Sequence, residues 1–148
     1  MATYLASAKG ALARVGSPCA TKSEITSRSL EGPPVQRNVW AFDLGQAGSL
    51  SNKRLLKKFE DHGFDGMRCD VDGNLYITRY GKGTVAVVSP AGKLLREIDV
   101  LGKSPSNLCF GGPDGRTVYV TEVEHRGLVQ FRVDRPGLAW QRWQDSRK

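Results

Sequence analysis

The sequence repeats itself with a period of about 42 residues, and this repeat limits the folds that the chain can adopt. The segment DVDGNLYITRYGKGTVAVVSPAGK (70–93) is similar to GGPDGRTVYVTEVEHRGLVQFRVDRPGL (111–138). The Asp-Gly turns at Asp72 and Asp114 are 42 residues apart. A repeat of this length, built from short strands and turns, is typical of the blade of a β-propeller.

Each copy contains the elements of a small antiparallel sheet. The expected strands are a short apolar run before each Asp-Gly turn (67–70 and 107–110), two strands joined by a charged, Gly-containing turn (75–79 with 84–88, and 117–122 with 127–133), and a more polar outer strand (93–100). Asp-Gly supplies the positive φ angles that tight hairpin turns need. The pattern therefore predicts consecutive antiparallel blades.

The alignment of the copies also predicts equivalent positions. Tyr76 matches Tyr119, Thr78 matches Thr121, Val85 matches Val129, and Val87 matches Phe131. Upstream, RNVWAFDLGQAG (37–48) matches GTVAVVSPAG (83–92), which indicates the end of a third blade.

The predicted fold class is all-β, with about two and a half propeller blades, whereas a closed propeller needs at least about four. A partial propeller is therefore expected. We divide the chain into a disordered or weakly structured leader and linker (1–37), the blades (38–138) and a basic C-terminal tail (139–148). The prolines of SLEGPPVQR (29–37) indicate the linker, because proline interrupts regular structure.

The net charge of +7 does not indicate a nucleic-acid-binding face, because much of the excess lies in the flanking segments. The nearest basic cluster, NKRLLKKFE (52–60), is predicted to be a solvated strand and loop. No apolar run approaches the ~20 residues that span a bilayer. We therefore expect neither a nucleic-acid nor a membrane partner.

The cysteines Cys19, Cys69 and Cys109 have neither a metal-binding pair spacing nor a disulfide pattern. Free thiols indicate a reducing compartment, so a cytoplasmic location is expected. Residues 1–23 are rich in Ala and Ser and contain no acidic residue, which leaves organelle targeting as an alternative. His62 and His125 are expected in solvent-facing loops, since neither has a Cys or a third His at ligand spacing.

Longer motifs resemble a known family. DGMRCDVDGNLYITRYGKGTVAVVSPAGKLL followed by PSNLCFGGPDGRTVYVTEV resembles the SMP-30/gluconolactonase/LRE-like family, and so does NVWAFDLGQAGSLSNKRLLKKFEDHGFDGM. The motifs occur in the order and spacing of that family and cover about residues 38–135. The resemblance implies a six-bladed propeller that hydrolyses sugar lactones or related esters. It also implies one divalent cation in the central channel, Ca²⁺ first, with Zn²⁺ or Mn²⁺ as alternatives.

The resemblance further implies the role of one carboxylate. The Asp of the family's Asp-Gly-Met motif is Asp65 here, and the resemblance makes it a metal ligand and a general base. The chemistry is consistent, because a hard cation takes oxygen ligands and lowers the pKa of a bound water. A carboxylate beside that water can accept its proton.

Three more residues are candidates for substrate binding. Ser106 and Asn107 align with Asp65 and Gly66 one repeat earlier, so we expect them at the same channel mouth. Asn107 would hydrogen-bond substrate or a metal-bound water, or it would cap the turn after Pro105. Arg79, at the end of the second strand, is expected on the same face, together with its neighbour Tyr80.

The sequence departs from the family at two points. Phe64 stands where the family usually has Pro, and the Glu and Asn metal ligands of the earlier blades have no counterpart. Three hypotheses follow. The chain is a lactone hydrolase that receives ligands from a second chain or a longer product, a truncated remnant without activity, or a binding module that recognises a partner through an exposed blade edge. The expected partners are a small-molecule lactone and a second chain supplying the missing blades.

Overall fold

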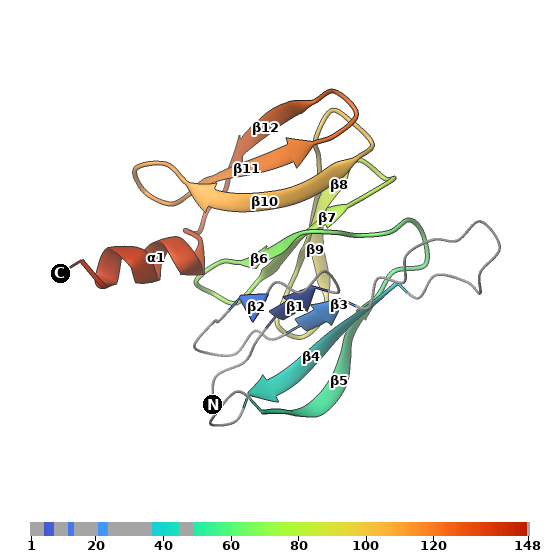
Figure 1. The fold of residues 1–148 in the computed structure, drawn as a ribbon, viewed down its shortest axis with the longest axis vertical. Coiled ribbons are helices and arrows are strands. Elements are labelled where there is room, and N and C mark those ends of the chain that lie inside the picture. Colours follow the sequence, from blue (N-terminus) through green and yellow to red (C-terminus); the bar gives the residue numbers. More distant parts are fainter. Residues whose placement is uncertain (1–4, 8–11, 14–20, 24–36, 45–48, 148) are drawn as a thin grey trace.

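Three β-sheets follow one another along the chain in the computed structural model, which describes residues 5–7, 12–13, 21–23, 37–44 and 49–147 (Figure 1). The first sheet has five strands in the order β2-β1-β3-β4-β5. Its members are β1 (Leu5–Ser7), β2 (Leu12–Ala13), β3 (Thr21–Ser23), β4 (Asn38–Leu44) and β5 (Leu50–Lys58). Strands β1, β2 and β3 lie within the leader that was expected to be disordered or weakly structured. The other residues of 1–36, and with them most of the alternative targeting segment (1–23), lie outside the described residues.

The second sheet is a complete four-stranded blade in the order β6-β7-β8-β9. Its antiparallel strands are β6 (Met67–Cys69), β7 (Leu75–Arg79), β8 (Thr84–Val88) and β9 (Leu94–Asp99). Every residue of β7 and β8 is buried, because other strands flank them and neighbouring sheets cover both faces. The expected strands are confirmed here to within about a residue.

The third sheet has three strands, β10 (Pro105–Gly111), β11 (Thr117–Glu122) and β12 (Gly127–Arg132), in that order. The short helix α1 (Leu138–Asp145) follows it and was not expected in the basic tail. The segment before the helix reaches the second sheet through a bridge between Asp70 and Gly137, and Leu138 packs on that sheet's core. Within the described residues, no helix is long and apolar enough to cross a membrane.

Two apolar cores hold the sheets together, one on each side of the complete blade. The core toward the first sheet includes Val39, Phe59, Phe64 and Ile77. The core toward the third sheet includes Tyr76, whose ring packs edge-on against Phe110 with centroids 5.0 Å apart. Because each core lies between sheets that are adjacent in sequence, the arrangement is that of successive propeller blades.

The strand registers correct the alignment of the repeats. Thr78 pairs with Val85 in the second sheet, and Thr121 pairs with Leu128 in the third. Val85 and Val87 are therefore equivalent to Leu128 and Gln130, not to Val129 and Phe131. The alignment was one residue out because it matched apolar residues to apolar residues, although the two connecting loops have the same length.

Candidate active site

The candidate active site lies where the inner strands of two neighbouring sheets begin. Asp65 and Gly66 precede β6, and Ser106 and Asn107 lie at the start of β10. The Gly66 N–H donates to the Ser106 carbonyl at 2.8 Å, so the two segments are in direct contact. We call the pair Asp65 and Gly66 the first corner of the site, and the pair Ser106 and Asn107 the second corner. The Asp65 N–H donates to the Thr78 carbonyl at 3.0 Å, which ties this residue to its own sheet. Asp65 is partly exposed, as a residue that meets a ligand must be.

Glycine at position 66 permits this contact. A Cβ atom on Gly66 would lie 2.7 Å from the Cα atom of Asn107, closer than real Cβ contacts occur. The close approach therefore requires the absence of a side chain. It joins the segment that carries Asp65 to the segment that carries the second pair of candidates.

The second corner is organised by a threonine that the sequence analysis did not select. The Thr121 hydroxyl lies 2.9 Å from the Ser106 hydroxyl and accepts the Asn107 N–H at 3.0 Å. The β10–β11 register shifts between Pro105 and Asn107, and such bulges often re-aim side chains next to active sites. Asn107 is exposed and its Oδ1 accepts the Leu108 N–H at 2.9 Å. The sequence offered one signal for Thr121, its alignment with Thr78 in the preceding repeat. The Thr78 hydroxyl donates to the Gly66 carbonyl at 3.1 Å, so it contacts the first corner as Thr121 contacts the second.

Arg79 does not lie open to a ligand. Its side chain is 1% exposed and its guanidinium stacks on Phe59, 3.7 Å from the ring centroid. It donates to the carbonyls of Asp61 at 2.9 Å and Gly63 at 3.3 Å, and it pairs with the carboxylates of Asp61 and Glu97. We therefore assign Arg79 the role of fixing the loop that leads to Asp65, instead of the predicted contact with substrate.

A carboxylate holds the equivalent loop of the third sheet. Glu122, 3% exposed, occupies the position that matches Arg79. It accepts the N–H groups of Ser104 and His125 at 2.8 and 2.7 Å. Burial alone raises the pKa of this carboxyl, but the backbone donors outweigh it and hold the pKa below its usual value. The loop before Ser106 is thus fixed by an acceptor, where the loop before Asp65 is fixed by a donor.

The ion pair of Asp61 predicts an acid-dependent loss of stability. The Arg79 guanidinium, hydrogen-bonded to the Asp61 carboxylate, holds the pKa of that carboxyl well below its usual range. A lowered folded-state pKa stabilises the protein above the unfolded pKa, and this contribution disappears as the pH falls through the folded value. We expect the melting temperature of wild type to exceed that of Asp61→Asn at neutral pH. The gap between the two melting temperatures should narrow below about pH 4. Thermal melts across this pH range measure the gap, and an unchanged gap would contradict the assignment.

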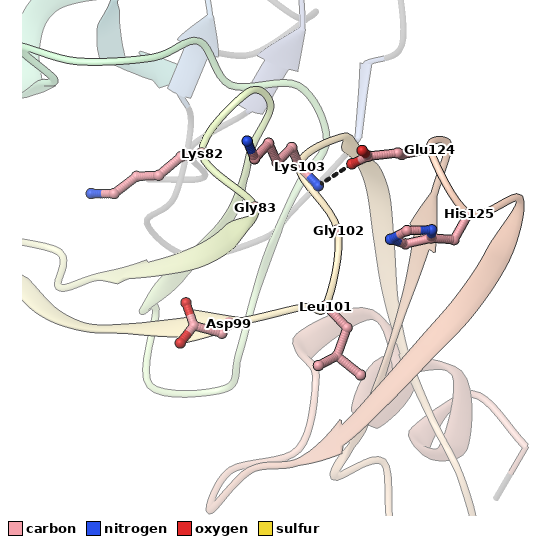
Figure 2. A pocket seen from close by; sticks show the side chains of 8 residues that line it. All are labelled: Lys82, Gly83, Asp99, Leu101, Gly102, Lys103, Glu124 and His125. Atoms are coloured by element: carbon pink, nitrogen blue, oxygen red, sulfur yellow. Dashed lines mark hydrogen bonds between the residues drawn. The ribbon is translucent and has the colours of Figure 1, made fainter.

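An open pocket of about 370 Å³ lies among loops at the same end of the blades (Figure 2). Its lining is Lys82, Gly83, Asp99, Leu101, Gly102, Lys103, Glu124 and His125. Charges of both signs line it, and the Lys82 ammonium already pairs with Glu97 at 2.6 Å. The pocket therefore favours no single class of ligand. His125 is exposed in its lining, and His62 is exposed in another loop, as expected for both histidines.

The described residues do not form a complete metal site. Within the ranges that the structure describes, no three His, Cys, Asp or Glu side chains lie close enough to hold one ion. A hard cation such as Ca²⁺ takes 6–8 oxygen ligands, several of them usually carboxylates. Asp65 and its neighbours therefore do not fit a divalent cation without ligands from elsewhere.

Comparison with known proteins gives consistent matches. The family model for the SMP-30/Gluconolactonase/LRE-like region matches residues 34–124. Regucalcin from Sus scrofa is 36% identical over 101 residues, which cover 63% of this chain and 34% of that protein. The solved structure of a putative gluconolactonase is 26% identical, with a TM-score of 0.59, and covers 70% of this chain and 35% of that one.

A third match is the structure of a calcium-binding protein, regucalcin, from Agrobacterium tumefaciens. It has a TM-score of 0.57 and 22% identity, and the match covers 67% of this chain and 39% of that one. At that identity it supports the fold alone. The chain thus spans little more than a third of the length of these proteins.

Proposed function

This chain belongs to the SMP-30/gluconolactonase/LRE-like family, and we propose that it carries part of the active site of a hydrolase acting on lactones or related esters. The observation that carries the proposal is the contact between the two corners, in which the Gly66 N–H donates to the Ser106 carbonyl. This contact gathers a partly exposed carboxylate, a hydroxyl and an exposed amide at one end of two inner strands. Sugar lactones are the first substrates to test.

In this proposal each side chain has a separate task. The Asp65 carboxylate accepts a proton from the water that attacks the lactone carbonyl. The Ser106 hydroxyl, oriented by Thr121 at 2.9 Å, and the Asn107 amide donate hydrogen bonds to substrate oxygen atoms. Arg79 and Glu122 do not touch substrate but hold the loops that position these groups.

A divalent cation remains part of the proposal, with Asp65 as one ligand and the other ligands contributed from outside the described residues. The family resemblance implies Ca²⁺ first, and the relatives include regucalcin, so Ca²⁺ is the first ion to test. The described residues alone offer too few ligands for such an ion. Its binding to the isolated chain is expected to be weak.

The test is hydrolysis of a sugar lactone by the purified chain, with and without millimolar Ca²⁺, for wild type and Asp65→Asn. Losing the general base should lower kcat/KM by at least about 100-fold. The matched control is Asp72→Asn, because this carboxylate pairs with Arg135 in a turn at the opposite end of β6 and should leave the rate unchanged. Thermal melts of all three proteins verify folding.

Two results would contradict the proposal. A folded wild-type chain without hydrolysis above background would identify a non-catalytic remnant or a binding module. An unchanged rate in Asp65→Asn would remove Asp65 from the reaction.

A further inference from the structure

Among the described strands, none covers the outer edge of the third sheet, where the second sheet has a fourth strand. In the second sheet β9 pairs along β8, and all five β8 residues are buried. In the third sheet β12 pairs with β11 alone among the described strands, and four of its six residues are exposed. Figure 1 shows β12 as the outermost strand of its sheet. The edge matters because unpaired backbone groups are a template for another strand.

The backbone groups that point to this edge follow from the strand pairing. The Val133 N–H donates to the Arg116 carbonyl at 2.9 Å, so residue 133 points toward β11. Backbone groups of successive residues in a strand point to opposite sides. Leu128, Gln130 and Arg132 therefore direct their N–H and C=O groups away from β11, to the free edge.

The same positions are paired in the complete blade. At the two ends of β8, the Gly83 carbonyl accepts the Val100 N–H at 3.0 Å, and the Ser89 N–H donates to the Lys93 carbonyl at 2.8 Å. Between these ends, Val85 and Val87 direct their backbone N–H and C=O groups toward β9. They are the equivalents of Leu128 and Gln130. The second sheet therefore shows that an edge of this kind is covered by a fourth antiparallel strand, β9.

We propose that the free edge of β12 binds an extended segment with the chemistry of β9, mixed apolar and charged, that another polypeptide supplies. Between Gly127 and Arg132 the edge has neither proline nor lysine, the residues that usually block pairing of an exposed strand. Leu128 is 70% exposed and gains cover from an added strand. The interaction is strand addition, in which main-chain hydrogen bonds supply much of the affinity. It is independent of the hydrolase proposal.

The probe is a fluorescent peptide with the sequence of residues 93–100, KLLREIDV, titrated into the chain. We expect saturable binding at one peptide per chain. Gln130→Pro removes one edge N–H while leaving the pairing with β11 intact, since proline is tolerated where its nitrogen faces outward. This variant should bind the peptide about tenfold more weakly or worse, whereas Gln130→Ala, which keeps the N–H, should bind it as wild type does.

Controls separate strand pairing from adhesion and from misfolding. A melting temperature close to that of wild type verifies that Gln130→Pro is folded. If this variant does not fold, the proposal is tested with the wild-type chain and a peptide carrying Arg96→Pro and Ile98→Pro. That peptide cannot pair and should not bind. Equal binding by the two peptides, no saturable binding, or full binding by folded Gln130→Pro would overturn the proposal. Sedimentation that shows a dimer of this chain, dispersed by Gln130→Pro, would also overturn it by assigning the edge to a second copy.

Discussion

Replacing Arg79 with methionine should lower the free energy of unfolding by about 4 kcal/mol, the range found when one partner of a buried ion pair is removed. Methionine fills much of the same volume beside Phe59 but donates no hydrogen bond. The carbonyls of Asp61 and Gly63 then lose their donor, and Glu97 loses its 3.1 Å partner. The cost is large because the arginine side chain is 1% exposed, so water cannot replace it.

Urea denaturation of wild type and Arg79→Met measures this change. Lys82→Met is the matched control, since Lys82 shares the partners Asp61 and Glu97 but is 29% exposed. It should cost about 1 kcal/mol or less, as partly exposed ion pairs do. Equal costs for the two variants would show that Arg79 acts as an ordinary surface charge and does not hold the loop before Asp65.

Gly66→Ala is expected to lower the free energy of unfolding by about 3 kcal/mol, at the upper end of the cost of overpacking. The new methyl group would overlap the backbone of Asn107, which cannot rotate away as a side chain would. The two corners must then separate, and the hydrogen bond from the Gly66 N–H to the Ser106 carbonyl lengthens or breaks.

The same denaturation measurement tests this, with Gly63→Ala as control. A Cβ atom on Gly63 would meet its nearest neighbour, the Tyr80 carbonyl oxygen, at 3.7 Å, an ordinary contact. Gly63→Ala should therefore change stability by less than about 1 kcal/mol. If Gly66→Ala were equally mild, the corners would not be in the close contact described here.

The sequence was sufficient for the blades because their pattern is local. Asp-Gly turns and alternating apolar residues predicted the strands 75–79, 84–88 and 117–122, which the structure confirms. Helix α1 escaped prediction because tertiary contacts fix its place. Its residue Trp140 lies over Gly115, and Gly137 just before it abuts Phe110, and no local pattern reveals such contacts.

The part of the candidate site that follows from the repeat could be predicted from the sequence. Aligning the copies placed Ser106 and Asn107 opposite Asp65 and Gly66, and the structure brings these pairs into contact. The repeat could not show where Arg79 points. A residue at a strand end can face a channel or a loop, and that choice depends on carbonyl groups 16 and 18 residues away in sequence.

The opposite charges of Arg79 and Glu122 bear on how such a protein can evolve. Both residues occupy the same place in their repeats and hold the loop before the inner strand, one by donating to carbonyls and the other by accepting from N–H groups. A rearrangement that joined the loop of one unit to the strand end of the other would place an arginine beside amide hydrogens or a glutamate beside carbonyl oxygens. The loop and the strand end of each unit are therefore matched to each other, so they are expected to be exchangeable only together.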